Sequence, residues 1–162
     1  MINIVLYHPE IAGNIGNIIR TCAIGGAKLH IIKGNTFSAN EKSLKRAALE
    51  YQPWLDIKYY DEYQQFLDEH PNIEIFCLTR KGIKIYSDVS YVTIKKPIYL
   101  LFGSETYGLP QEILTNNNHF QIRIPMKPFA RSLNLANAVA IVLYEIQRQF
   151  NYENLAFFNV ID

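Results

Sequence analysis

Long hydrophobic runs and paired cysteines are both missing from this chain of 162 residues. Its apolar stretches fall well short of the ~18 residues that a membrane-spanning helix requires. The start, MINIVLYHPE, has no basic segment and no small-residue cleavage site, so we interpret it as a strand rather than a signal peptide. The two cysteines, Cys22 and Cys77, lie far apart and form no Cys-x-x-Cys pair. The sequence therefore predicts a cytoplasmic protein with reduced thiols.

An excess of positive charge is also absent, since 16 Lys and Arg residues face 15 Asp and Glu residues. This balance excludes a dedicated basic coat for nucleic acid but allows a local basic patch. The four histidines show no metal-ligand spacing, so no metal site is expected. The segment GNIGN fits neither glycine-rich nucleotide loop, and the chain has no Gly-x-Ser-x-Gly elbow of hydrolases. Any function has to be inferred from particular positions.

Short β-type runs do alternate with helical patterns along the whole chain. We expect strands at residues 2–7, 28–33, 56–60, 74–79, 98–103 and 121–125. We expect helices at residues 14–25, 41–50, 60–70, 109–115 and 134–149. Apolar strands between helices predict an α/β fold with a mostly parallel sheet, helices on both faces, and residues 98–103 at its centre. Since no linker or repeat interrupts the pattern, residues 1–162 are expected to form a single domain.

Polar loops follow two of the predicted strands. In LLFGSETYGLP (100–110) a buried strand stops at Gly103, and Ser, Glu and Thr come next. Ligands of open α/β sheets bind beyond the carboxyl ends of strands. Glu105 therefore lies either in a binding site or in a tight turn that exposes its side chain to solvent. The segment QIRIPMKPFARS (121–132) repeats this arrangement before the last helix.

The first and last predicted helices each have two different faces. In the first helix the apolar stripe consists of Ile15, Ile18, Ile19, Cys22 and Ala23, and Asn17 and Arg20 lie opposite. In the last helix it consists of Leu135, Val139, Val142 and Ile146. The opposite face of that helix carries Asn137, Ile141, Tyr144 and Arg148. Such a mixed face suits either burial against a partner or an ordinary surface.

Three segments together resemble the motifs of a known family: PEIAGNIGNIIRTCA, LLFGSETYGLP and IRIPMKPFARSLNLANAVAIVLYE. They are similar to the SPOUT superfamily of knotted RNA methyltransferases, and most of all to its small TrmL-type branch. The resemblance extends nearly end to end and includes KSLKRAALEY (42–51) and CLTRKG (77–82). It implies a deep C-terminal trefoil knot, S-adenosyl-L-methionine as cofactor, a homodimer, and the tRNA anticodon stem-loop as partner without a separate RNA-binding domain.

The resemblance also implies roles for particular residues around loops 78–82, 103–108 and 124–132. The cofactor would contact Leu78, Gly103, Glu105, Gly108, Ile124, Pro125, Met126, Ser132, Leu133 and Asn137. The catalytic set would be Arg20, Asn14, Asn17, Glu105 and Asn134. Because a guanidinium stays protonated, we expect Arg20 to grip a phosphate and stabilise the forming alkoxide rather than act as a base. RNA contacts are expected from Lys42, Lys45, Arg46, Arg80, Lys81, Lys127, Arg131 and Tyr144.

Three positions depart from the usual family pattern. Ile15 stands where Thr is common, Tyr107 where Arg or Ser is common, and Ala136 where Ser is common. The implied reaction is methylation of the ribose 2′-hydroxyl of the wobble nucleotide, C or U, with tRNA-Leu as the expected acceptor. Two alternatives stay open: another tRNA or rRNA ribose as the target, or a non-catalytic homologue that only binds RNA.

Overall fold

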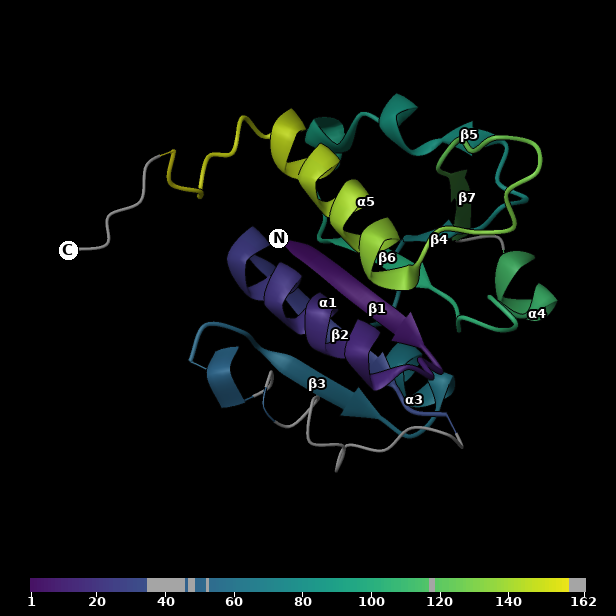
Figure 1. Ribbon diagram of the computed structural model, residues 1–162, viewed down its shortest axis with the longest axis horizontal. Helices are drawn as coiled ribbons and strands as arrows, with labels where there is room; N and C mark the ends of the chain where they lie inside the picture. Colours follow the sequence, from purple (N-terminus) through teal and green to yellow (C-terminus); the bar gives the residue numbers. More distant parts are fainter. Residues whose placement is uncertain (35–45, 47–48, 52, 117–118, 158–162) are drawn as a thin grey trace.

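A parallel sheet of seven strands forms the centre of the computed structural model, which describes residues 1–34, 46, 49–51, 53–116 and 119–157. The strands are β1 (Ile2–Tyr7), β2 (Ala27–Ile32), β3 (Ile57–Tyr60), β4 (Ile75–Leu78), β5 (Lys84–Ile85), β6 (Ile98–Phe102) and β7 (His119–Arg123). Their order across the sheet is β3-β2-β1-β6-β4-β7-β5, and every pairing is parallel (Figure 1). The predicted parallel sheet is confirmed, and β6 is its central strand.

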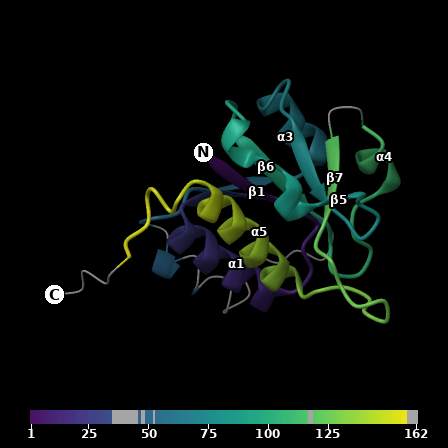
Figure 2. The ribbon, with the colours of Figure 1, turned by 90° about the horizontal axis from the view of Figure 1, so that it is seen from above.

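Helices cover both faces of the sheet, as the apolar strands require. They are α1 (Ala12–Gly25), α3 (Tyr63–Glu69), α4 (Gln111–Leu114) and α5 (Leu135–Gln149), with short 3-10 helices η1 (Tyr86–Asp88) and η2 (Tyr91–Thr93). Figure 2 shows α1 and α5 side by side on one face of the sheet and α3 on the other. No helix in the described ranges is long and apolar enough to cross a membrane.

A few element boundaries differ from the sequence-based prediction. The helix expected from residue 60 begins at Tyr63, because β3 extends to Tyr60. The strand expected at 121–125 runs over His119–Arg123 instead. The two residues of β5 escape prediction because so short a strand has no period to detect. Most of the helix expected at 41–50 lies outside the described residues.

The two helices on the first face bury the apolar stripes predicted for them. On α1 the buried residues include Ile15, Ile18, Ile19 and Cys22, and on α5 they include Leu135, Val139, Val142 and Ile146. Gly25 lets the helices approach closely, because a Cβ there would lie 2.7 Å from Leu143 Cδ2. Gln147 Nε2 also donates to the Gly25 carbonyl at 2.5 Å. Gly26 then ends α1 in the left-handed conformation, with φ of 68°.

On the opposite face, a buried chain of hydrogen bonds links Asn3, His30, Tyr60, His70 and Tyr99. The Asn3 amide nitrogen donates to a backbone carbonyl, so its oxygen accepts from His30 Nε2 at 3.2 Å. The neutral His30 then accepts from the Tyr60 hydroxyl through Nδ1 at 3.0 Å. Tyr60 accepts from His70 Nε2, and Tyr99 donates to His70 Nδ1. Both imidazoles are therefore satisfied in their neutral forms.

Acid should weaken this part of the core. Burial, with the neighbouring His70, lowers the pKa of His30 to about 4 from its ordinary 6.5. As the pH falls from 6.5 toward 4, the unfolded chain binds a proton at His30 that the folded chain does not, so the free energy of unfolding decreases. In a His30→Gln variant, which keeps a donor and an acceptor but does not titrate, this decrease should be smaller. Urea unfolding at several pH values measures the difference, and equal pH slopes for the two proteins would contradict the assignment.

Candidate cofactor and substrate site

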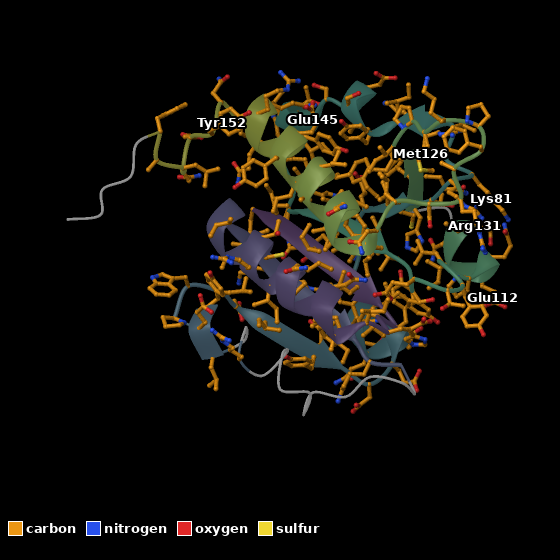
Figure 3. All side chains as sticks on the ribbon, in the orientation of Figure 1. Lys81, Glu112, Met126, Arg131, Glu145 and Tyr152 are labelled. Carbon is orange, nitrogen blue, oxygen red and sulfur yellow. The ribbon has the colours of Figure 1, made fainter. Side chains whose placement is uncertain are left out.

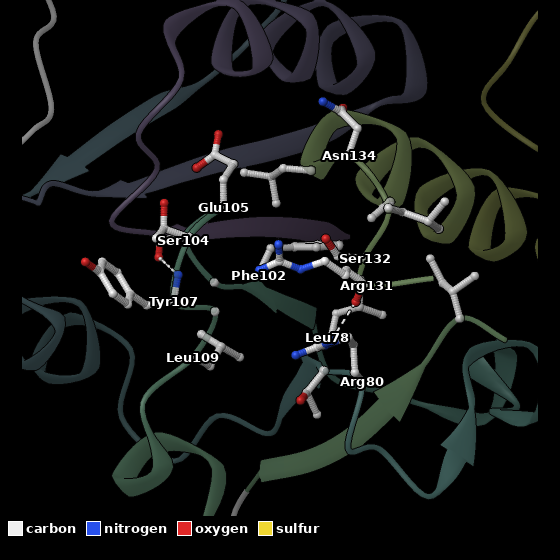
Figure 4. A pocket seen from close by; sticks show the side chains of 18 of the residues that line it. Leu78, Arg80, Phe102, Ser104, Glu105, Tyr107, Leu109, Arg131, Ser132 and Asn134 are labelled. Carbon is white, nitrogen blue, oxygen red and sulfur yellow. Dashed lines mark hydrogen bonds between the residues drawn. The ribbon is translucent and has the colours of Figure 1, made fainter. Parts of the chain in front are cut away.

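A cavity of about 730 Å³ opens beyond the carboxyl ends of β4 and β6, next to the start of α5. Three loops line it, from residues 78–81, 102–109 and 124–135, and Ile11 and Asn14 close it at the start of α1. Figure 3 shows Lys81, Met126 and Arg131 from these loops on one side of the molecule, and Figure 4 gives a close view. This is the place where open α/β sheets bind ligands.

The loop after β6 has no room for a side chain at its first position. A Cβ on Gly103 would lie 2.2 Å from the carbonyl carbon of Gly108, because the loop folds back on itself. Gly108 N donates to the Ser104 carbonyl at 3.0 Å, and Tyr107 N donates to Ser104 Oγ at 3.1 Å. Gly108 has φ of 71°, a conformation that favours glycine. The fold of this part of the cavity wall therefore depends on glycine at position 103, because any Cβ there would collide with the Gly108 backbone.

The loop after β4 ties two other segments to the cavity. Thr79 N donates to the Ile122 carbonyl at 3.0 Å, and a Cβ on Gly82 would lie 2.5 Å from the carbonyl carbon of Ile122. Arg80 Nη1 donates to the Arg131 carbonyl at 2.8 Å (Figure 4). The loop thus fixes β7 and the segment before α5 by backbone contacts and one charged donor.

Glu105 points toward the start of α1, so its carboxylate is not free in solvent. Its carboxylate accepts from Glu10 N at 2.9 Å, from Ile11 N at 3.2 Å and from Asn14 Nδ2 at 2.9 Å. α1 has no acidic residue in its own first turn. A negative charge near a helix N-terminus is stabilising. Glu105, which follows β6, therefore supplies the negative charge that the first turn of α1 lacks.

The same hydrogen-bond chain continues into α5. Asn134 Nδ2 donates to Asn14 Oδ1 at 2.9 Å, so the starts of α1 and α5 are joined. Asn134 Oδ1 accepts from Ala136 N at 3.0 Å and from Asn137 N at 3.3 Å, which makes Asn134 the N-cap of α5. Asn134 is therefore both the cap of α5 and one of the residues that line the cavity.

The structure brings most of the predicted cofactor residues together. Those that line the cavity are Leu78, Gly103, Glu105, Gly108, Ile124, Met126, Ser132 and Leu133. Pro125 and Asn137 are exposed and are not among the lining residues. Pro125 belongs to a loop whose neighbours Ile124 and Met126 do line the cavity, and Asn137 lies on the outer face of α5.

The predicted catalytic residues fall into two groups. Asn14, Glu105 and Asn134 line the cavity, and Asn14 is hydrogen-bonded to each of the other two. Asn17 and Arg20 are exposed on α1 and are not among the lining residues. The Arg20 guanidinium lies 5.7 Å from the centre of the Tyr51 ring, within range of a cation–π contact.

The predicted RNA contacts are also divided. Arg80, Lys81 and Arg131 line the cavity. Lys127 is exposed on the loop before α5, Tyr144 is half exposed on α5, and Arg46 is exposed. Lys42 and Lys45 lie outside the described residues.

Other residues of the cavity wall were not predicted individually. Thr79, Ser104, Thr106 and Tyr107 lie within the loops that were predicted, whereas Ile11, Phe102, Leu109, Leu114, Leu135 and Ala138 lie outside them. Most of them lie next to a strand end or to a glycine named above, so the rule that ligands bind beyond strand ends could have identified them. No such rule applies to Leu114, because it belongs to α4. Of the three unusual residues, Ile15 and Ala136 are buried, whereas Tyr107 is 88% exposed.

An open parallel sheet with a cavity beyond its strand ends, shaped by glycine backbone, defines an α/β protein that binds a cofactor-like ligand. The model of the SpoU rRNA Methylase family matches residues 1–144, and the chain belongs to this family. It is 48% identical, over 158 residues, to a tRNA (cytidine(34)-2'-O)-methyltransferase of Yersinia pestis, and the match covers 94% of this chain and 96% of that relative.

Solved structures agree with this assignment. One, from work on the 2-OH methylation of C/U34 on tRNA, is 38% identical with a TM-score of 0.84, and the match covers 94% of this chain and 98% of that one. An AdoMet-bound rRNA methyltransferase from Sinorhizobium meliloti is 29% identical with a TM-score of 0.78. That match covers 91% of this chain and 56% of the Sinorhizobium chain.

Adding a methyl group at Gly103 should damage the cavity wall. The added Cβ in a Gly103→Ala variant would push against the Gly108 backbone, and such overpacking costs about 1–3 kcal/mol of folding free energy. We expect a lower melting temperature and at least tenfold weaker binding of S-adenosylmethionine, about 1.4 kcal/mol, by calorimetry. Gly13→Ala is the matched control, because nothing lies within 4 Å of a Cβ there and Ala favours helix. Unchanged affinity and melting temperature in Gly103→Ala would refute the close approach.

Proposed function

We propose that this protein transfers the methyl group of S-adenosylmethionine to the ribose 2′-hydroxyl of the wobble nucleotide, C or U, in a tRNA anticodon. The observation that carries the proposal is the cavity beyond β4 and β6. Its three loops bear the residues that the family pattern assigns to the cofactor. The relatives named above, one a tRNA (cytidine(34)-2'-O)-methyltransferase and one from work on C/U34, support this target.

The cavity suits the cofactor by its shape and by its mixed lining. The tight fold of the loop at Gly103 sets the shape of one wall, and Leu78, Ile124 and Leu133 offer apolar contacts to an adenosine. Ser132 is a polar partner on the same wall. When bound, S-adenosylmethionine supplies a methyl group activated by its positively charged sulfur. The protein's own task is to hold the ribose hydroxyl in line with that methyl, so positioning dominates the rate.

Arg20 is the residue proposed to act on the hydroxyl. Because its guanidinium does not lose its proton, Arg20 would bind the adjoining phosphate and stabilise the negative charge that develops on the 2′-oxygen. Arg20 is not among the residues that line the cavity of its own chain. Its role therefore requires a second copy of the chain.

A homodimer through the outer face of α1 and α5 would meet this requirement. We define this face by the exposed residues of the two neighbouring helices: Asn17, Arg20, Ile24, Asn137, Ile141, Tyr144 and Arg148. The exposed fraction is 55% for Ile24, 37% for Ile141 and 38% for Tyr144. Apolar, aromatic and Arg side chains together are typical of interface cores. In a two-fold pair, Arg20 of one copy would serve the cavity of the other.

The knot implied by the resemblance is part of the proposal. β7 lies between β4 and β5, so the connection from 79 to 83 between those two earlier strands has to cross it. The crossing is tight, since a Cβ on Gly82 would meet the Ile122 backbone. Loops that later chain passes through are rare in proteins. We propose that one such domain, residues 1–162, both binds tRNA and transfers the methyl group in the cytoplasm, where its two buried thiols stay reduced.

Methyl transfer and the dimer can be tested in one series. The wild-type protein should move labelled methyl from S-adenosylmethionine to total tRNA. Arg20→Ala and Glu105→Ala should each lose at least 100-fold in turnover. Arg20→Ala loses charge stabilisation of the transition state, which contributes a factor of ~10²–10³ to the rate. Glu105→Ala loses the hydrogen bonds that hold the cavity loop against the start of α1. Arg20→Lys should stay strongly impaired, since a point charge does not replace the guanidinium fork.

Mixing the two inactive Ala variants, after dissociation and reassociation, should restore about a quarter of wild-type turnover if copies pair at random as a two-fold dimer. Half of the dimers would then be mixed, and each mixed dimer has one intact site. Recovery of no activity would exclude the arrangement across two copies. Binding of S-adenosylmethionine by the wild type without transfer to any RNA would favour the non-catalytic alternative.

A further inference from the structure

An exposed aromatic ring stands at the rim of the cavity. Tyr107 is 88% exposed, yet it is one of the residues that line the cavity. The family pattern often has Arg or Ser at this position, so Tyr107 departs from that pattern. Single exposed aromatic rings are common on protein surfaces, so it is the place of this ring at the cavity that makes it a candidate ligand contact.

The backbone beneath this ring is fixed. Tyr107 N donates to Ser104 Oγ at 3.1 Å, and Ser104 and Gly108 form an antiparallel bridge. Gly103 also lies close against the backbone of Gly108. The ring is therefore presented on a loop that has little freedom to lose when a ligand binds, which favours affinity.

Cations stand across the cavity from this ring. Figure 4 shows Tyr107 on one side and Arg80 and Arg131 on the other, and Lys81 also belongs to the cavity wall. Proteins hold single-stranded RNA with this combination, in which positive side chains bind phosphates and an aromatic ring stacks on a base. A duplex keeps its bases stacked inside, so the arrangement fits an unpaired loop.

We propose that Tyr107 stacks on a nucleobase next to the methylated nucleotide, while Arg80, Lys81 and Arg131 bind the phosphates on the far side of the cavity. This inference rests on the proposed function and adds a positioning residue for its RNA. The ring holds the anticodon loop across the cavity mouth so that the target ribose reaches the cofactor. It makes no chemical contribution to methyl transfer.

The probe is a tRNA-Leu transcript with 2-aminopurine on one side or the other of the wobble nucleotide. Stacking quenches the fluorescence of this base, and we expect quenching in one of the two transcripts with wild-type protein and Tyr107→Phe but not with Tyr107→Ala. Tyr107→Ala should also raise the Kd for tRNA about tenfold, in line with the loss of one stacked base. Its affinity for S-adenosylmethionine should stay at the wild-type value, whereas kcat/KM for tRNA should fall at least as much as tRNA binding weakens, because the ring positions the ribose.

Trp54→Ala is the control, because Trp54 is 71% exposed but precedes β3, at the amino-terminal edge of the sheet, away from the cavity. It should leave both quenching and Kd unchanged. If Tyr107→Ala weakens cofactor binding but not tRNA binding, the ring covers the cofactor and the inference falls. If the wild type binds and methylates tRNA normally but Tyr107→Ala shows the same quenching and the same Kd, the stacking inference is wrong and the proposed function stands. A wild-type protein that neither binds nor methylates tRNA overturns the proposed function and this inference with it.

Discussion

The carboxylate of Glu105 holds together the parts of the chain on which the cavity depends. It lies just beyond the central strand and accepts hydrogen bonds from the start of α1, including one from Asn14. Asn14 in turn accepts from Asn134, which caps α5. One chain of polar contacts therefore sets the position of a loop and two helices. Since α1 and α5 also pack against each other, the geometry of the cavity and the geometry of the outer face of α1 and α5 are linked.

Backbone shape, rather than charge, defines most of the remaining cavity. At Gly103 and Gly82 a Cβ would lie within 2.5 Å of another peptide group, so only glycine allows these segments to meet. The cations among the residues that line the cavity are Arg80, Lys81 and Arg131. In the proposed function, the apolar and backbone wall would hold the cofactor and these cations would bind the phosphates of the RNA.

Much of the fold could be predicted because it depends on local periodicity. The stripes of α1 and α5 and the central place of β6 follow from apolar spacing alone, and the strand-end rule found the loops at Gly103 and Ile124. The insertion of β7 between β4 and β5 could not be predicted, because spacing does not encode the order of strands. The bond from Asn134 to Asn14 joins residues 120 apart in sequence, which no local pattern reports. Periodicity also placed Arg20 on the outer face of α1, but it does not show what that side chain contacts.

The most direct test of the central claim is to locate the transferred methyl group. Purified protein, labelled S-adenosylmethionine and unfractionated tRNA would be incubated together, and the labelled tRNA digested to nucleosides and to oligonucleotides for mass spectrometry. The account predicts label in 2′-O-methylcytidine or 2′-O-methyluridine, within the anticodon fragment and at the wobble nucleotide. Label on a base, or on a ribose outside the anticodon, would contradict it.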